Sequence, residues 1–457
     1  MSQLYASLFY QPEITEIFSD KGVVHYMLQA EAALAQAQAK VGVIPESAAA
    51  RITDVVQQPI DKVIDFTALA QASGLAGNIA IPFVKQLTAA VKQIDEDASR
   101  YVHWGATSQD IIDTACILQC REGLKLIETQ LIQAIKATQQ LTEQYRDQVM
   151  IGRTWLQQGL PLTFGHKTAR WLASLQRDLE RVQALKHSTL TVQLGGAVGT
   201  LASLLDQGTT VVKAFAAELQ LNVPDCTWHG ERDRMVEIAH VLATITGNLG
   251  KMARDWSLMM QTEIAEVFEP SGAGRGGSST MPHKRNPVAA ASILAAANRV
   301  PALMSSIYQS LVQEHERSLG AWHAEWLALP EIFQLCAGSL ARAIEVFEGI
   351  EVQADNMHRN LDCTQGLIMA EALMMALAPK LGRMNAHHLV EAACKQAVSE
   401  KRHLLDVVQN TPEITAIFDS AQLKGILNPQ HYLGNTQQQI DAVLQRVQGK
   451  ATHVIDQ

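Results

Sequence analysis

The feature that most constrains this chain is a run of apolar residues with heptad spacing between residues 238 and 259. Its members follow one another at alternating steps of four and three residues: Ile238, Leu242, Ile245, Leu249, Met252, Trp256 and Met259. This spacing places one apolar stripe along a helix and is typical of long helices that pack at a shallow angle. Gly247 and Gly250 lower the local helix propensity, but the stripe continues past both. We therefore expect a bundle of long helices.

Proline breaks helix interiors, and its spacing leaves long parts of the chain uninterrupted. No proline occurs between Pro82 and Pro161, between Pro161 and Pro224, or between Pro224 and Pro270. One of these segments carries a second helical pattern, made by Leu172, Leu175, Leu179, Val182 and Leu185. Signals for strands are nearly absent, because no stretch alternates polar and apolar residues between turn residues. The sequence therefore predicts an all-α fold.

Three helical domains are expected. The first, residues 1–110, contains an alanine-rich helix from Met27 to Lys40 that ends near Gly42 and Pro45. The second, residues 111–355, carries the long-helix bundle. The third, residues 356–457, has short helical patterns and is expected to form a small closing domain. Inside the second domain, residues 270–287 contain glycine at 272, 274, 276 and 277, which predicts a mobile loop.

Composition argues against several classes of function. The chain has 37 basic and 46 acidic residues and a formal net charge of −9, which disfavours binding to nucleic acid or to an anionic membrane. Its longest strongly apolar stretch, residues 288–297, falls short of the roughly 18 residues that span a bilayer. The first residues lack the pattern of a secretory signal. We therefore expect no membrane segment and a cytoplasmic location.

The six cysteines contain no CxxC pair and are expected to be buried free thiols. Cys116 and Cys120 would share one helix face, but no His or carboxylate near them completes the spacing of a metal site. No metal and no cofactor are expected.

Residues 272–287 read GAGRGGSSTMPHKRNP. The glycines make the backbone pliable, two serines supply hydroxyls, and His283, Lys284 and Arg285 concentrate positive charge in an acidic chain. Such a loop could bring an oxyanion and a cation to a negatively charged substrate. Composition alone favours a flexible solvated loop whose basic residues arise by chance.

The order of the residues in this loop favours a functional role over a flexible solvated loop. Residues 278–287, SSTMPHKRNP, resemble the signature loop of the fumarase/aspartase superfamily. Two further motifs of this superfamily occur in the expected order: HWGATSQDIIDT at residues 103–114 and GRTWLQ at residues 152–157. The resemblance covers essentially the whole chain. It implies a central helical bundle and an elimination or addition beside a carboxylate.

The resemblance assigns the chemistry to the loop. Ser278 matches the residue that removes a proton beside a carboxylate and leaves an aci-carboxylate dianion. An ordinary serine is too weak a base, so Lys284 and nearby backbone N–H groups would have to stabilise its alkoxide. Lys284 and Asn286 match the positions that hold the reacting carboxylate.

The same resemblance implies substrate-binding roles for residues of the two earlier motifs, whose hydroxyls and amide can donate to carboxylate oxygens: Thr107, Ser108, Thr154 and Gln157. His103 resembles a histidine that many adenylosuccinate lyases place near their substrate. A purely structural hydrogen-bonding role for His103 is equally open.

One departure from the superfamily motifs limits the kinds of leaving group that the enzyme could release. Fumarases and related lyases usually carry Thr-His in the second motif, and this chain carries Thr154-Trp155, so the usual acid is missing. Hydroxide and amines need a proton in order to leave, whereas a carboxylate, with a pKa of about 4, leaves as a stable anion. The departure resembles the lactonising branch of the superfamily, in which a carboxylate adds across a double bond within one molecule. Trp155 would cover the planar substrate, unless it merely fills space behind the site.

Residues 314–326, EHERSLGAWHAEW, resemble the same branch and make Arg317 a candidate partner for a tricarboxylate substrate. The alternative for this segment is a solvated helix face with Trp322 and Trp326 as packing anchors.

Two alternative functions stay open at this point: an adenylosuccinate lyase-like enzyme and a catalytically inactive structural homologue. The intact Ser278, Lys284 and Asn286 argue against loss of activity. The three motifs lie far apart along rigid helices, so they are expected to meet between chains. We therefore expect a homotetramer with shared active sites and a small-molecule tricarboxylate as its partner.

Overall fold

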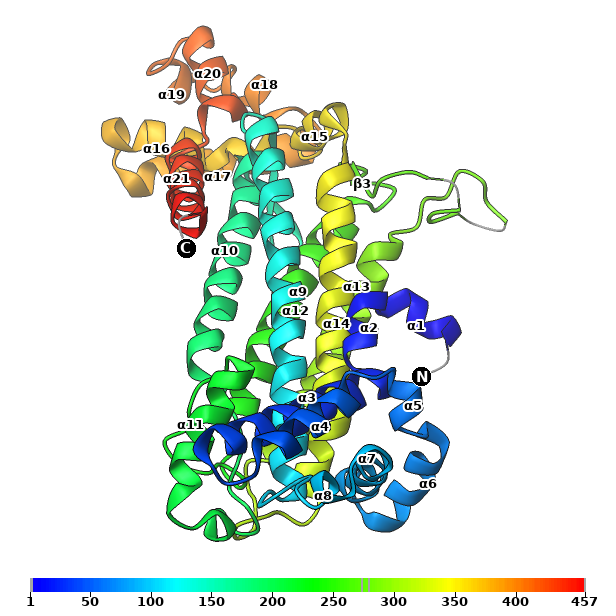
Figure 1. Cartoon of the computed structure of the whole chain (residues 1–457). Helices are drawn as coiled ribbons and strands as arrows, with labels where there is room; N and C mark the ends of the chain where they lie inside the picture. Colours follow the sequence, from blue (N-terminus) through cyan, green and yellow to red (C-terminus); the bar gives the residue numbers. More distant parts are fainter. Residues whose placement is uncertain (1–2, 273, 278–279, 456–457) are drawn as a thin grey trace. The chain divides into compact units, whose positions relative to one another are not determined.

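The computed structural model describes residues 3–272, 274–277 and 280–455 and is dominated by helices, which confirms the all-α prediction (Figure 1). The helices are α1 (Gln3–Phe9), α2 (Pro12–Ile17), α3 (Asp20–Val41), α4 (Glu46–Val56), α5 (Ile60–Val63), α6 (Phe66–Ala76), α7 (Ala80–Ile94), α8 (Glu96–Ser99), α9 (Ser108–Gln144), α10 (Phe164–Ser188), α11 (Gly208–Leu219), α12 (Asp233–Met259), α13 (Val288–Gln309), α14 (Ala321–Gly349), α15 (Ala354–Leu361), α16 (Ala370–Leu381), α17 (Arg383–Glu400), α18 (Leu404–Val408), α19 (Pro412–Thr415), α20 (Ser420–Ile426) and α21 (Thr436–Ile455). The strands are β1 (Val149–Thr154), β2 (Gln157–Thr163), β3 (Val267–Phe268) and β4 (Glu351–Val352), and the 3-10 turns are η1 (Ala202–Gln207), η2 (Leu367–Met369) and η3 (Pro429–His431).

The chain divides into two compact units, each built from separate stretches of sequence. Unit 1 comprises Met1–Ile132, Arg177–Gly250 and Ser292–Arg342, and unit 2 comprises Gln133–Gln176, Lys251–Ala291 and Ala343–Gln457. The long helices α9, α10, α12, α13 and α14 contribute residues to both units. The division into three contiguous domains stays a prediction.

The heptad stripe is the buried face of α12. Each of its seven residues is at most 3% exposed, as a bundle seam requires. Gly250 lies on this helix where Ala297 of α13 approaches, and a Cβ on Gly250 would come within 2.6 Å of the Ala297 Cβ. The glycine that weakens the local helix propensity is therefore needed for the close approach of two helices in unit 1.

Unit 1 also contains a core formed by the N-terminal helices. Helix α3 packs against α4 and α11, and its apolar residues belong to one buried cluster with those of α7. Ser19 caps the start of α3 by accepting a hydrogen bond from the Gly22 N–H, and Gly42 ends the helix in a left-handed conformation at φ 83°. The predicted end of the alanine-rich helix is thereby confirmed.

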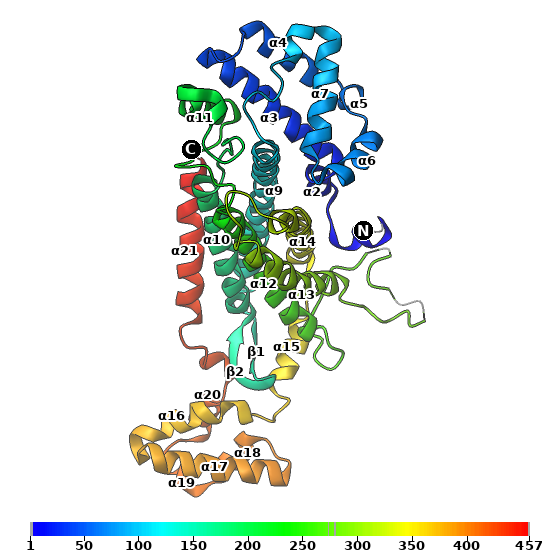
Figure 2. The same cartoon turned by 90° about the horizontal axis from the view of Figure 1, so that it is seen from below.

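Unit 2 contains a β-hairpin that the strand patterns did not reveal. β1 and β2 pair antiparallel from Val149–Thr163 to Thr154–Gln157, with an irregularity in register between Ile151 and Arg153 (Figure 2). This irregularity interrupts the polar–apolar alternation, and the connecting residues are not the glycine or asparagine typical of such turns. The short helices α16 to α20 of this unit form a separate apolar cluster with Ile151.

Two of the described helices, α13 and α14, are long and apolar enough to cross a membrane by length and composition alone. In their most apolar windows, 39% and 67% of the residues, respectively, are buried. Core helices of proteins outside membranes meet the same criterion, so the two helices are weak evidence for a membrane span.

The expectation for the cysteines is confirmed only in part. Cys120 and Cys336 are buried, and burial raises the pKa of both thiols. Cys226 and Cys363 are exposed, because both lie in connecting segments rather than on the packed face of a helix. All six are free.

Candidate active site

The predicted site residues fall into two groups. Unit 1 carries His103, Thr107, Ser108 and Arg317, and unit 2 carries Thr154, Trp155, Gln157, Lys284 and Asn286. Ser278 lies outside the described residues.

A buried carboxylate holds the start of α9, where Thr107 and Ser108 lie. Asp110, in the first turn of α9, accepts hydrogen bonds from the backbone N–H groups of Thr107 (2.9 Å), Gly195 (2.9 Å) and Gly196 (3.0 Å). His229 Nε2 lies 2.7 Å from the same carboxylate. The start of α9 and the segment at residues 195–196 are thus held together by one anion. We did not single out Asp110 from sequence, although Thr107 followed three residues later by Asp110 has the spacing of a helix capping box.

Arg317 and Thr107, which are 210 residues apart, are in contact. Arg317 Nη2 donates to Thr107 Oγ1 at 3.0 Å and to the Ala197 carbonyl at 3.2 Å. Arg317 Nε is buried and has no hydrogen-bond partner among the residues that the structure describes. A buried guanidinium N–H without a partner can donate to the carboxylate of a ligand. The contact fits the expected role of Arg317 in binding an anionic substrate, and that role stays a prediction.

His103 is held by an acidic partner that we did not identify from sequence. Its Nδ1 lies 2.6 Å from Oε1 of Glu31, a buried residue of α3, and its backbone is left-handed at φ 57°. Burial lowers the pKa of His103, but the charge and hydrogen bond of Glu31, together with the charge of Asp110, outweigh burial and leave the pKa raised. His103 therefore makes a structural hydrogen bond, which was one of the two roles expected for it. Its contact with substrate, the other expected role, stays a prediction.

A buried ion network joins the 314–326 segment to α9. Arg232, fully buried, donates to both carboxylate oxygens of Asp113 (2.7 and 3.1 Å) and of Glu325 (2.6 to 3.2 Å). Trp322 Nε1 donates to the Asp113 carboxylate at 2.9 Å. Trp322 is thus a packing anchor, but the face of α14 that carries Trp322 and Glu325 is buried rather than solvated.

In unit 2, Trp155 lies at the tip of the hairpin. Trp155 and Leu156 form the turn between β1 and β2, with left-handed φ values of 53° and 64° and exposed fractions of 98% and 74%. Side chains other than glycine adopt this conformation at a cost of roughly 1–2 kcal/mol per residue. Within its own chain Trp155 fills no space, so the strained turn presents an indole ring to its surroundings. Thr154 and Gln157 pair at the base of this turn.

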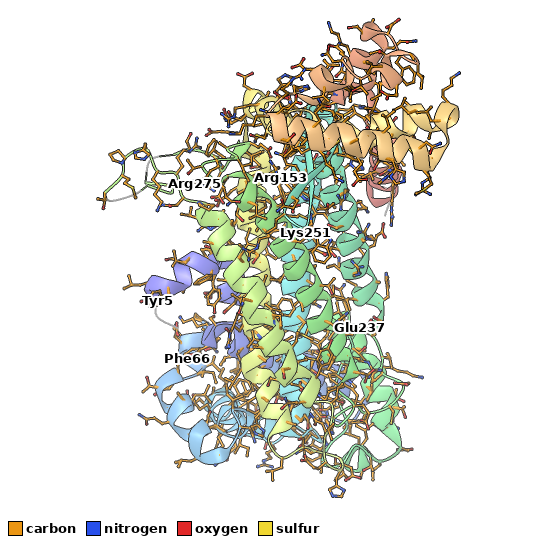
Figure 3. The ribbon with its side chains drawn as sticks, turned by 180° about the vertical axis from the view of Figure 1, so that it is seen from behind. Tyr5, Phe66, Arg153, Glu237, Lys251 and Arg275 are labelled. Atoms are coloured by element: carbon orange, nitrogen blue, oxygen red, sulfur yellow. The ribbon has the colours of Figure 1, made fainter. Side chains whose placement is uncertain are left out.

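An ion pair fixes the hairpin below its tip. Arg153, which is labelled in Figure 3, donates through both terminal nitrogens to Glu266, at 2.8 and 2.7 Å. Glu266 is fully buried and also accepts from Asn360 Nδ2 at 2.9 Å. This fork places Thr154 and Trp155 on a rigid support.

The loop residues Lys284 and Asn286 have different environments. Lys284 is exposed, and within the described part of the chain no carboxylate forms an ion pair with its ammonium group. The Asn286 N–H donates to the Gly276 carbonyl at 2.9 Å. Gly276 has a φ of 64°, and a Cβ there would lie 2.7 Å from the Asn286 carbonyl oxygen, so only glycine fits. Lys284 can therefore offer an unpaired cation to an anionic ligand.

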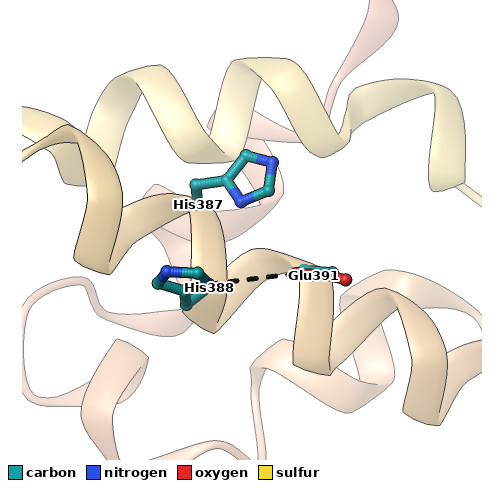
Figure 4. Close-up of side chains that lie close together, drawn as sticks. All are labelled: His387, His388 and Glu391. Atoms are coloured by element: carbon teal, nitrogen blue, oxygen red, sulfur yellow. Dashed lines mark ion pairs between the residues drawn. The ribbon is translucent and has the colours of Figure 1, made fainter.

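Of the described residues, one group brings histidines and a carboxylate close enough to hold a metal ion. His387, His388 and Glu391 lie on α17, and their potential ligand atoms are within 4.8 Å of one another (Figure 4). All three are exposed, and Glu391 is already paired with Lys395 at 2.6 Å. Because such exposed groups are common without an ion, we assign no metal site to them.

Family comparison agrees with the motifs. A family model described as "Lyase" matches residues 9–302, and one described as "Adenylosuccinate lyase C-terminus" matches residues 366–443. The chain belongs to this lyase family, within the fumarase/aspartase superfamily that its signature loop indicated.

Within this family, the chain is highly similar to several individual proteins. The chain is 68% identical to the 3-carboxy-cis,cis-muconate cycloisomerase of Acinetobacter baylyi, over 99% of this chain and 100% of that protein. It is similar to the crystal structure of the β-carboxy-cis,cis-muconate cycloisomerase of Acinetobacter calcoaceticus, with a TM-score of 0.92, 66% identity, and coverage of 97% of this chain and 100% of that one. It is also similar to the 3-carboxy-cis,cis-muconate lactonizing enzyme of Pseudomonas putida, with a TM-score of 0.93, 46% identity, and coverage of 98% and 99%, respectively.

Proposed function

We propose that this chain is an intramolecular lyase that interconverts 3-carboxy-cis,cis-muconate and 4-carboxymuconolactone, a step in the breakdown of protocatechuate through the β-ketoadipate pathway. Its full-length similarity to cycloisomerases supports the substrate. Within the site, one observation favours lactone chemistry over release of hydroxide or an amine. Position 155 holds an exposed tryptophan where related lyases place a histidine that acts as an acid.

The reaction conserves all atoms. In the direction of lactone formation, an oxygen of one substrate carboxylate bonds to a carbon of a double bond. The neighbouring carbon, which lies beside another carboxylate, takes a proton from Ser278, and the resulting Ser278 alkoxide regains a proton from solvent. In the reverse direction, the Ser278 alkoxide removes that proton, and the ring carboxylate leaves as an anion. No redox equivalent or cofactor is consumed.

The remaining side chains bind two of the three carboxylates of the substrate and line the approach to the site. Lys284 and Asn286 bind the carboxylate beside the reacting carbon, where negative charge accumulates in the aci-carboxylate dianion. Arg317, with Thr107 and Ser108, supplies donors for another carboxylate, and Thr154 and Gln157 line the approach at the hairpin. His103 orients a polar group of the substrate.

Trp155 replaces a proton donor with an apolar cover. The indole N–H donates a hydrogen bond but does not give up its proton at neutral pH. A leaving carboxylate needs no such proton, because its conjugate acid has a pKa of about 4. The ring instead excludes water from the planar diene or lactone.

We further propose that the active enzyme is a homotetramer with shared sites. In support, only 39% of the apolar window of α13 is buried in a single chain, and Val312, just beyond this helix, is 81% exposed. Helices of this composition require cover, and a second copy of the chain supplies matching surfaces. We also propose a cytoplasmic location, with which six free cysteines are compatible.

The test is to offer the purified protein carboxymuconate, malate, aspartate, argininosuccinate and adenylosuccinate in parallel. We expect loss of the diene absorbance of carboxymuconate and no release of fumarate from the other four. Turnover of adenylosuccinate would favour the adenylosuccinate lyase alternative. Lack of turnover with all five would favour an inactive homologue.

A further inference from the structure

The two stems of the loop at residues 270–287 converge on one carboxylate, that of Glu351. The Ser271 N–H on the first stem donates to Glu351 Oε1 at 3.1 Å. On the second stem, Arg285 donates through Nη1 to Oε2 at 2.7 Å and through Nη2 to Oε1 at 2.8 Å. Glu351 therefore bridges two residues that are 14 positions apart in sequence. The hydrogen bond from Arg285 is the main reason that the pKa of Glu351 is lowered to about 2, so its carboxylate is ionised at neutral pH. We call the contacts of Glu351 with Ser271 and Arg285 the clamp.

The Arg285 side chain is 38% exposed and has protein partners in addition to Glu351. Besides the fork to Glu351, Nη2 donates to the Glu269 carbonyl at 2.7 Å. The guanidinium carbon lies 4.7 Å from the centre of the Phe268 ring. Phe268 and Glu351 are themselves partners in the β3–β4 pair. Arg285 is therefore part of the stem and has few donors left for a ligand.

The segment after the loop is pinned by a second acid. The Glu269 carboxylate accepts from the N–H groups of Ala289 and Ala290, both at 2.9 Å, at the start of α13. It also accepts from Trp256 Nε1 at 3.0 Å. The backbone on the C-terminal side of Arg285 is thus fixed to the buried face of unit 2.

Lys284 and Asn286 are the immediate neighbours of Arg285 in the chain. Arg285 donates three hydrogen bonds to protein partners, whereas the Lys284 ammonium has no carboxylate partner in the described ranges. Because a fixed Arg285 limits the backbone on both sides, the ion pair with Glu351 determines where Lys284 and Asn286 can reach. Arg275, on the same loop, adds a weaker tie through Glu345 at 3.0 Å.

We propose that Glu351 is a positioning residue for this reaction, which with Arg285 closes the stem of the loop and sets Lys284 and Asn286 for the reacting carboxylate. This inference rests on the proposed function. Glu351 acts through Arg285 and touches no reacting atom.

The test compares Glu351→Gln with Glu348→Gln, a change of the same chemistry at an exposed residue near the end of α14. Glutamine keeps an oxygen for the Ser271 N–H but replaces the other with an amide that cannot accept from Arg285. A displacement of about 1 Å at reacting groups can cost roughly 100-fold, so we expect kcat to fall about 10- to 100-fold in Glu351→Gln and to be unchanged in Glu348→Gln. Arg285→Lys, which keeps the charge but loses the fork, should reproduce the loss from the other side of the clamp.

A second measurement distinguishes a local effect on the loop from a general loss of folded structure. Hydrogen exchange in a peptide covering residues 280–291 should accelerate in Glu351→Gln and Arg285→Lys, while exchange in peptides of α12 stays as in the parent protein. Unchanged exchange, or faster exchange with undiminished kcat, would overturn the inference. If the parent protein does not turn over carboxymuconate, the proposed function fails, and the exchange measurement still tests the clamp by itself.

Discussion

The buried Arg232 network allows a quantitative prediction about stability. In Arg232→Met, the carboxylates of Asp113 and Glu325 lose the cation that they share, in a region where all three side chains are at most 3% exposed. Removal of one partner from a buried ion pair costs about 3–5 kcal/mol, because the remaining charge is uncompensated. Solvent screening does not reduce this figure at such low exposure. We expect the free energy of unfolding to fall by about that amount at neutral pH.

The loss should depend on pH with a defined sign. Burial raises the pKa of Glu325 above its usual 4.5, and Arg232 opposes this rise. In the variant the opposition is gone, so the pKa in the folded state rises further. A carboxyl whose folded pKa exceeds its unfolded pKa contributes stability that is complete below the unfolded value and is lost as pH rises through the folded value. The variant should therefore be less impaired at about pH 5.5 than at about pH 8.

The assay is urea-induced unfolding followed by far-UV circular dichroism at both pH values and one fixed protein concentration. The double variant Arg232→Met with Glu325→Gln serves as the control, and it should be more stable than Arg232→Met at the higher pH because one buried charge is removed. A loss below about 1 kcal/mol at the higher pH, or an equal loss at both pH values, would refute the reasoning.

Four further predictions concern the site. Ser278→Ala and Lys284→Met should each lower turnover of carboxymuconate by about two orders of magnitude or more, with unchanged circular dichroism, and near-normal turnover in either would remove its catalytic assignment. Trp155→Phe should retain more turnover than Ser278→Ala, because one apolar ring can replace another as a cover; equal losses would indicate a chemical role for Trp155. Glu31→Gln should lower the pKa of His103, measured by NMR titration of the imidazole, and should remove stability that is complete below a pH of about 6.5 and lost as pH rises through the raised folded pKa; an unchanged pKa would contradict the pairing. Light scattering should give the mass of four chains, and a monomeric mass would exclude the shared-site tetramer.

The local patterns in the sequence determined the helical part of this fold. The stripe from Ile238 to Met259 identified the buried face of α12 because helix periodicity is a property of neighbouring residues. Gly42 ended α3 for the same reason, since a left-handed residue stops a helix locally. The signature loop and its companion motifs identified the family because they are contiguous strings. Proline was a weaker guide, because Pro301 and Pro330 lie inside α13 and α14.

Only the tertiary structure decided which groups hold the site in place. Asp110 gathers N–H groups from residues 195 and 196, Arg317 reaches Thr107, and Glu351 joins Ser271 to Arg285. The directly bonded partners are 66 to 210 positions apart in the sequence, and no periodicity relates them. The exposed, strained turn at Trp155 likewise arises from the pairing of β1 with β2 rather than from turn residues. A sequence of this kind predicts which side chains carry chemistry, because their types and order are local, whereas the buried charges around them are paired by packing across the whole unit.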